Sequence, residues 1–146
     1  MILRASGHED RYRQYARDAG VEQIARFEPP IGHYDALAEM LTADGLLIFQ
    51  GSNCNHLVPA KLYEYFRAGR PIVALTDAAG ESAQLMREHG MPYVFDMTDP
   101  VRIAAGLEVF LADLAAGRAV RPDEASRLRY SRRQQTAELG ALFDSL

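Results

Sequence analysis

One stretch of the sequence, residues 59–75, limits what this chain can fold into more than any other. Its first part carries apolar side chains at helical spacing, and Gly69 follows where a helix would end. Pro59 suits the first helical position, whose N–H needs no partner within the helix. Pro71 then opens the apolar run 72–75, which is typical of a strand buried on both faces of a parallel sheet. A helix joined so closely to a buried strand predicts a layered α/β fold.

The rest of the chain repeats this alternation of short apolar runs and helical patterns. Strands are expected at residues 1–6, 24–27, 45–49, 72–75 and 92–95, and helices at residues 9–19, 34–41, 59–68, 81–89, 99–116 and 122–146. Strands that alternate with helices form parallel sheets, which bind ligands at the carboxyl ends of their strands. We therefore expect one α/β domain over residues 1–146, a doubly wound, Rossmann-like parallel sheet of about five strands flanked by helices.

Charge and cysteine content exclude several classes of protein. The formal net charge of −4 argues against a nucleic-acid-binding protein, because such proteins usually carry a basic surplus. Cys54 is the only cysteine, which excludes an internal disulfide and a cysteine-based zinc site, and the scattered histidines predict no metal site. No apolar run approaches the roughly 20 residues of a membrane-spanning helix, and no signal segment opens the chain. These features predict a cytoplasmic protein without a membrane span.

A cation and a carboxylate lie on the first two turns of the expected helix 59–68. Lys61 and Glu64 are three residues apart, so their side chains neighbour each other away from the apolar face. At this end of a helix the backbone N–H groups are free, and the helix dipole favours an anion. The pair therefore indicates a site for the phosphates and ribose of a nucleotide. A plainer interpretation stays open, in which Lys61 and Glu64 are a solvated pair of charges on the helix surface. Lys61 is also the only lysine of the chain, and a general preference for arginine codons explains this as well as a need for lysine at a phosphate site does.

Residues 56–74 resemble the nucleotide-binding helix of retaining glycosyltransferases with the GT-B fold (glycosyl transferases group 1). In that family two glutamates flank a turn and the start of a helix, which ends shortly before a buried strand. Glu64 matches the second glutamate and Pro71 falls in register, whereas His56 takes the place of the first glutamate. Residues 2–7, 21–34 and 43–48 resemble other strands and a loop of the same family. The chain is thus similar to the carboxyl-terminal, nucleotide-sugar-binding domain of such an enzyme, without its amino-terminal domain.

The resemblance implies a role for each site residue. Glu64 would accept hydrogen bonds from ribose hydroxyls, and His56 stands where the family's glutamate grips the donor sugar, which makes it a catalytic candidate. Backbone N–H groups at the start of the helix would face the diphosphate; they belong to Leu57, Val58, Ala60 and Lys61. Gly51 and Ser52 follow the carboxyl end of a strand and could contact the ligand, although turn chemistry also explains them.

These features lead to two hypotheses of different classes. The first is an enzyme part, the nucleotide-sugar-binding half of a glycosyltransferase that moves a sugar from a nucleoside-diphosphate donor to an acceptor, with no cofactor beyond that donor. Its acceptor-binding domain would be supplied in cis or in trans, and the isolated chain would be inactive. The second is a binding or interaction module that keeps the half-fold without the chemistry. An unpaired sheet edge could also recruit a second copy and form a homodimer.

Overall fold

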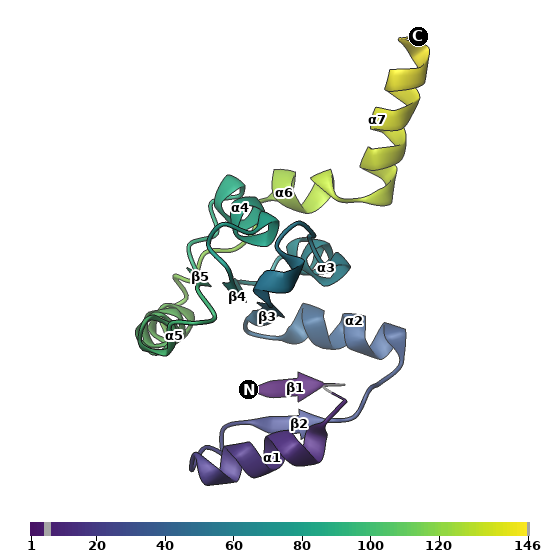
Figure 1. The fold of residues 1–146 in the computed structure, drawn as a ribbon. Helices are drawn as coiled ribbons and strands as arrows, with labels where there is room; N and C mark the ends of the chain where they lie inside the picture. Colours follow the sequence, from purple (N-terminus) through teal and green to yellow (C-terminus); the bar gives the residue numbers. More distant parts are fainter. Residues whose placement is uncertain (5–6, 146) are drawn as a thin grey trace. The chain divides into compact units, whose positions relative to one another are not determined.

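The computed structural model of the protein describes residues 1–4 and 7–145, and the chain forms two compact units, Met1–Ala38 and Glu39–Leu146 (Figure 1). Within the described residues the fold is α/β, with five parallel strands flanked by helices, so the expected Rossmann-like class is confirmed. The strands pair as two sheets, one in each unit. The organisation as a single domain stays a prediction.

The first unit consists of a two-stranded sheet and the helix that connects its strands. β1 (Ile2–Arg4) and β2 (Arg26–Glu28) pair in parallel, and α1 (Glu9–Asp18) lies between them in the chain. The core of this unit is small and comprises Ala16, Ala25 and Phe27, with Leu3 packed against them.

The second strand of the first unit differs from the prediction, and the end of the first strand cannot be compared with it. The second strand begins at Arg26 and not at Ile24, because the N–H groups of Ile24 and Ala25 both donate to the Val21 carbonyl in a turn. The first strand was predicted over residues 1–6, and residues 5–6 lie outside the described residues.

The second unit holds a three-stranded parallel sheet in the order β3–β4–β5. Its strands are β3 (Leu46–Gln50), β4 (Ile72–Thr76) and β5 (Val94–Phe95), and the central β4 is buried along its whole length. Because side chains alternate between the faces of a strand, β4 supplies two core clusters. Ile72 and Ala74 belong to one, and Val73 and Leu75 belong to the other.

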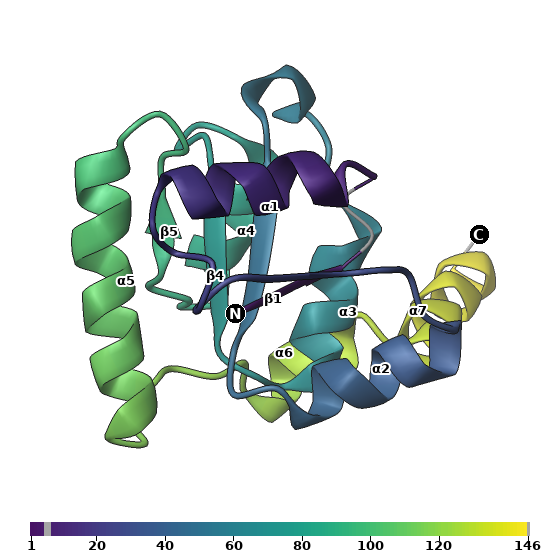
Figure 2. The ribbon, with the colours of Figure 1, turned by 90° about the horizontal axis from the view of Figure 1, so that it is seen from below.

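Helices cover both faces of this sheet, as a doubly wound fold requires. α3 (Ala60–Ala68) and α4 (Glu81–Glu88) pack on one face, and α5 (Pro100–Ala115) packs on the other. The buried side chains that make these contacts are Leu62, Phe66, Met86 and Phe110. Figures 1 and 2 show α3 and α5 on opposite sides of β4. Ahead of the sheet, α2 (His33–Thr42) contains the boundary between the two units.

Helix ends follow local sequence signals, with a difference at Pro59. Gly69 adopts a φ of 66° after α3, a left-handed conformation that glycine reaches without strain. Asp99 caps α5 by accepting a hydrogen bond from the Arg102 N–H at 2.9 Å. Pro59 is not the first helical residue, as predicted, but the N-cap, because its ψ of 137° is still extended. The helix therefore begins at Ala60.

The C-terminal segment forms two helices, whereas the sequence pattern predicts one over residues 122–146. α6 (Glu124–Arg129) ends before Ser131, and α7 (Arg132–Asp144) begins after it. Ser131 breaks the helix because its ψ of 144° is extended and its hydroxyl accepts a hydrogen bond from the Gln134 N–H at 3.1 Å. Across residues 1–4 and 7–145, no helix combines the length and apolar character needed to cross a bilayer.

Candidate functional site

The carboxyl ends of β3 and β4 lie side by side, because their last residues, Gln50 and Thr76, pair in the parallel register. Two helices begin beyond these ends, α3 after the loop 51–59 and α4 after the loop 77–80. Ligands of open parallel sheets bind outside the carboxyl ends of the strands. We therefore place the candidate site at this edge.

A buried glutamine at the end of β3 holds the first loop in shape. Gln50 is 8% exposed, and its Nε2 donates to the Cys54 carbonyl at 2.8 Å and to the Leu57 carbonyl at 2.6 Å. Its Oε1 accepts a hydrogen bond from the hydroxyl of Ser82 on α4. One side chain thus satisfies two loop carbonyls and links the loop to the next helix.

A second set of hydrogen bonds joins the two loops to each other. Asn55 Nδ2 donates to Asp77 Oδ2 at 2.8 Å, and the Asn55 carbonyl accepts from the Glu81 N–H at 2.8 Å. Hydrogen bonds from the Ala79 N–H and then from Asn55 hold the pKa of Asp77 below its usual value. Within the described residues, Asn55 Oδ1 and the Thr76 hydroxyl are buried without a hydrogen-bond partner. Such unsatisfied groups are rare in folded proteins.

The start of α3 offers backbone N–H groups for a ligand. The Leu57 N–H already donates to the Cys54 carbonyl at 3.0 Å, so it is not available, although we predicted that it faces a diphosphate. The N–H groups of Val58, Ala60 and Lys61 have no acceptor in the part of the chain that the structure describes. Val58 packs its side chain against the core, which leaves only its backbone for a ligand. An uncapped helix start of this kind is suited to an anion.

The two charged side chains predicted for this site meet on α3. Lys61 Nζ lies 3.1 Å from Glu64 Oε2, and the two side chains are 52% and 35% exposed. An exposed pair of this kind contributes at most about 1 kcal/mol to stability, so a ligand can replace it at little cost. Burial, and then the Glu64 carboxylate, raise the pKa of the neighbouring Tyr65. The Tyr65 hydroxyl donates to the Leu47 carbonyl at 3.4 Å and is turned toward β3.

The remaining predicted residues lie on the surface of the first loop. Gly51 and Ser52 are exposed, and Ser52 opens the short 3₁₀ turn η1 (Ser52–Cys54). His56 is also exposed, and among residues 1–4 and 7–145 nothing forms a hydrogen bond with its ring. A general acid or base is normally held in place by a partner. The structure therefore leaves His56 accessible but without an orienting contact.

The start of α4 is a second uncapped helix start at the same edge. Gly80 is its N-cap and has no side chain to cap the helix; a Cβ at this position would lie 3.0 Å from Asn55 Oδ1. The N–H groups of Ser82 and Ala83 find no acceptor within the described residues. Sequence alone marks this position only by the small residues before Glu81, which are equally typical of a turn.

Away from this edge, His89 forms a cluster with two residues of a later helical segment, Ser126 and Tyr130, that no motif reveals. His89 Nδ1 lies 2.7 Å from Ser126 Oγ, and Nε2 lies 2.5 Å from the Tyr130 hydroxyl. A serine beside a histidine can be a nucleophile. Here, however, Ser126 is only 6% exposed and Tyr130 occupies the other ring nitrogen, so the cluster holds helices together and does not attack a substrate.

Comparison with known proteins identifies no relative, since no protein-family model, curated protein or solved structure matches the chain. The described residues also contain no group of three or more His, Cys, Asp or Glu side chains that could hold a metal ion. The resemblance of residues 56–74 to GT-B glycosyltransferases therefore stays a prediction from the sequence.

Proposed function

We propose that this chain binds a nucleoside-diphosphate sugar at the carboxyl edge of the sheet in the second unit, as the donor-binding part of a glycosyltransferase. One observation supports this above all: the start of α3 presents the free N–H groups of Val58, Ala60 and Lys61, with the Lys61 ammonium on the same turn. Free N–H groups and the helix dipole favour an anion, and the ammonium adds a full positive charge. The diphosphate would occupy this position.

The nucleoside would extend along the exposed face of α3. Glu64 lies about one turn beyond Lys61, and its partly exposed carboxylate can accept hydrogen bonds from the ribose 2′ and 3′ hydroxyls. A bound diphosphate would attract the Lys61 ammonium away from Glu64. This exchange would leave the carboxylate free for the ribose.

In the proposed reaction, the bond between the anomeric carbon and the diphosphate oxygen breaks, and the diphosphate leaves with the electron pair. The free N–H groups and Lys61 would stabilise the negative charge that develops on it. The acceptor hydroxyl forms the new bond to the anomeric carbon, and its proton passes to the diphosphate that leaves. A separate acceptor-binding domain must hold that hydroxyl, because donor and acceptor react only when they are held together. The purified chain should therefore transfer no sugar, and turnover by this chain alone would contradict the assignment.

A second candidate function is a binding or interaction module that keeps this half-fold without transferring sugar. His56 favours it, because this exposed histidine, whose ring has no hydrogen-bond partner among the described residues, stands where the similar family has a carboxylate. The contact between Lys61 and Glu64 favours it as well, since the two charges satisfy each other without a ligand.

Ligand-observed NMR with uridine, guanosine and adenosine diphosphates separates the two candidates. We expect a Kd in the millimolar range, which corresponds to about −4 kcal/mol, because only one wall of the cleft is present. Lys61→Met should weaken binding. Arg67→Met removes an exposed charge at the other end of α3, so this matched control should bind like the unchanged protein. Absence of binding for all three diphosphates at high concentration would favour the interaction module.

A further inference from the structure

The last helix, α7, packs too little of its surface to account for its own stability. It is 13 residues long and buries none of them, and in Figure 1 it extends from α6 away from the strands of the second unit. Isolated helices shorter than about 12–15 residues are marginal in water, and most helices in proteins are stabilised by packing of an apolar face. α7 therefore needs a surface to pack against.

Large apolar side chains lie together on one face of α7. Leu139 is three residues before Leu142 and four before Phe143, so the three side chains are neighbours on the helix surface. They are 52%, 57% and 65% exposed, respectively. The opposite face carries the small residues Ala137 and Ala141. The large apolar face is thus the one that a partner would cover.

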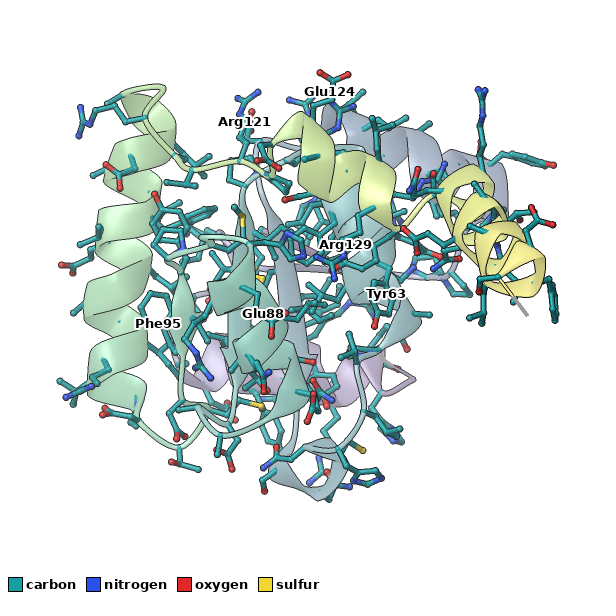
Figure 3. All side chains as sticks on the ribbon, turned by 90° about the horizontal axis from the view of Figure 1, so that it is seen from above. Tyr63, Glu88, Phe95, Arg121, Glu124 and Arg129 are labelled. Atoms are coloured by element: carbon teal, nitrogen blue, oxygen red, sulfur yellow. The ribbon has the colours of Figure 1, made fainter. Side chains whose placement is uncertain are left out.

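The charges of α7 oppose its helix dipole. Arg132 and Arg133 lie in the first turn, at the positive end of the dipole, and Asp144 ends the helix at the negative end. α6 has the favourable order, with Glu124 in its first turn and Arg129 in its last; Figure 3 labels both. Among the described residues, no ion pair compensates the three charges of α7. These charges weaken the helix when it stands alone.

We infer that α7 packs antiparallel against α7 of a second copy of this chain and so forms a homodimer. In this order the positive end of each helix lies beside the negative end of the other, and both the dipoles and the side-chain charges attract. Parallel order would bring like charges together. A two-fold pair of this kind is self-complementary, so one sequence supplies both halves of the contact.

The spacing of the charges fixes the centre of the pair. Arg133 and Asp144 are separated by about three helical turns, so they lie on the same flank of the apolar face. A centre between residues 138 and 139 places Arg133 of each copy level with Asp144 of the other, because the two positions are equally far from it. Leu139 then lies within about 1 Å of the centre along the axis, so its two copies meet there.

One contact of this arrangement is unfavourable. Glu138 lies on the other flank of the apolar face, close to the centre, and approaches Glu138 of the second copy. Like charges repel, which limits the affinity. A helix of 13 residues is also only about 20 Å long, so the contact is smaller than a standard protein interface. We therefore expect a weak dimer with a Kd of about 0.1 mM.

Sedimentation equilibrium of the full chain from about 0.01 to about 1 mM, a range that brackets this Kd, tests the inference. We expect the mass to change from monomer to dimer, and the amide NMR signals of α7 to gain helical character over the same range while those of β4 stay in place. A chain that remains monomeric at the highest concentration would overturn the inference. A helical α7 in that monomer would mean that another part of the chain covers it, and an unstructured α7 would leave the face to a different protein.

Variants locate the contact on α7. Leu139→Gln removes the central apolar side chain from both copies and should raise the Kd at least about tenfold. Ala141→Gln is the matched control, because it lies on the opposite face and should leave the Kd unchanged. Neither position is buried, so the sheet should fold normally in both variants. A dimer that Leu139→Gln does not weaken lies elsewhere, for example at a sheet edge, and contradicts the inference.

Charge reversals test the antiparallel order. Arg133→Asp and Asp144→Arg should each weaken the dimer several-fold, because each variant brings two pairs of like charges together. Both changes suit the dipole of the isolated helix, so a loss of helix cannot explain the weakening. An equimolar mixture of the two variants should associate like the unchanged chain, since every contact then joins opposite charges. Glu138→Gln should tighten the dimer. If single reversals leave the Kd unchanged, or the mixture does not recover, the antiparallel pair is refuted.

Discussion

Gln50→Leu should destabilise the second unit by about 3 kcal/mol, because it removes three buried hydrogen bonds at a net cost of roughly 1 kcal/mol each. The lost partners are the carbonyls of Cys54 and Leu57 and the hydroxyl of Ser82. Leucine keeps a similar volume at this buried position, so no large cavity adds to the loss. The change therefore isolates the polar contacts that shape the loop.

Thermal unfolding followed by circular dichroism measures this loss. A destabilisation of this size should lower the melting temperature by roughly 12–24 °C, because 1 kcal/mol corresponds to roughly 4–8 °C in a domain of about 100 residues. Gln84→Leu is the matched control, since Gln84 is exposed and its hydrogen bond to Glu88 lies on the surface. Its effect should stay within about 0.5 kcal/mol. If the two leucine variants melt within a few degrees of each other, Gln50 does not hold the loop.

Gln50→Glu separates hydrogen bonding from size at the same position. A carboxylate there would face the carbonyl oxygens of Cys54 and Leu57 with no hydrogen to donate, so this variant should be less stable than Gln50→Leu at neutral pH. A protonated carboxyl can donate to one carbonyl, so its folded pKa lies above the unfolded value of about 4.3. Stability is then highest below that value and falls as the pH rises through the folded pKa. If both variants depend on pH in the same way, the orientation assigned to the Gln50 amide is incorrect.

Three further changes test the site and the packing beside the sheet. Glu64→Gln should weaken nucleoside-diphosphate binding by roughly 1–3 kcal/mol in the NMR assay, and much less for a 2′,3′-dideoxy nucleotide; equal losses would place the ribose elsewhere. Lys61→Met should weaken binding of the diphosphate but hardly that of the nucleoside, and the difference should fade with added salt. If both variants bind nucleotides normally but unfold at a lower temperature, Lys61 and Glu64 form a structural salt bridge and not a ligand site. Gly106→Ala should lower stability by roughly 1–3 kcal/mol, because a Cβ there overlaps the Phe95 ring. Gly140→Ala is the control and should leave stability unchanged, because nothing lies within 4 Å of a Cβ at that position. Equal melting temperatures for the two variants would show that the Phe95 ring moves aside at no cost.

Local signals explain why much of the fold was predictable from the sequence. The stop at Gly69 and the apolar run of β4 each depend on a few neighbouring residues, and the structure confirms both. The break at Ser131 was missed because the apolar pattern continues across it, while the serine hydroxyl caps a new helix. The pairing of the strands as two sheets depends on contacts between distant residues, which short-range periodicity does not encode.

The site was predictable only in part, for the same reason. Lys61 and Glu64 are three residues apart, and the structure brings them together as helical spacing requires. Gln50 reaches Ser82, 32 residues later, and His89 reaches Ser126, 37 residues later, and neither spacing belongs to a recognisable motif. The Leu57 N–H seemed free from helix geometry alone, but the loop folds back and uses it.

The helix starts of the second unit differ in a way that bears on the proposed function. α5, α6 and α7 each begin with a side chain that accepts a backbone hydrogen bond, from Asp99, Asp123 and Ser131. α3 and α4 begin with Pro59 and Gly80, which provide no such cap. A missing cap typically costs about 1 kcal/mol of stability, or a few tenths of that where glycine is the N-cap, as at Gly80, and here both omissions lie at the carboxyl ends of the strands, where ligands of such sheets bind. A capping side chain would occupy the same N–H groups that a phosphate would use, so stability and anion binding compete at these two positions.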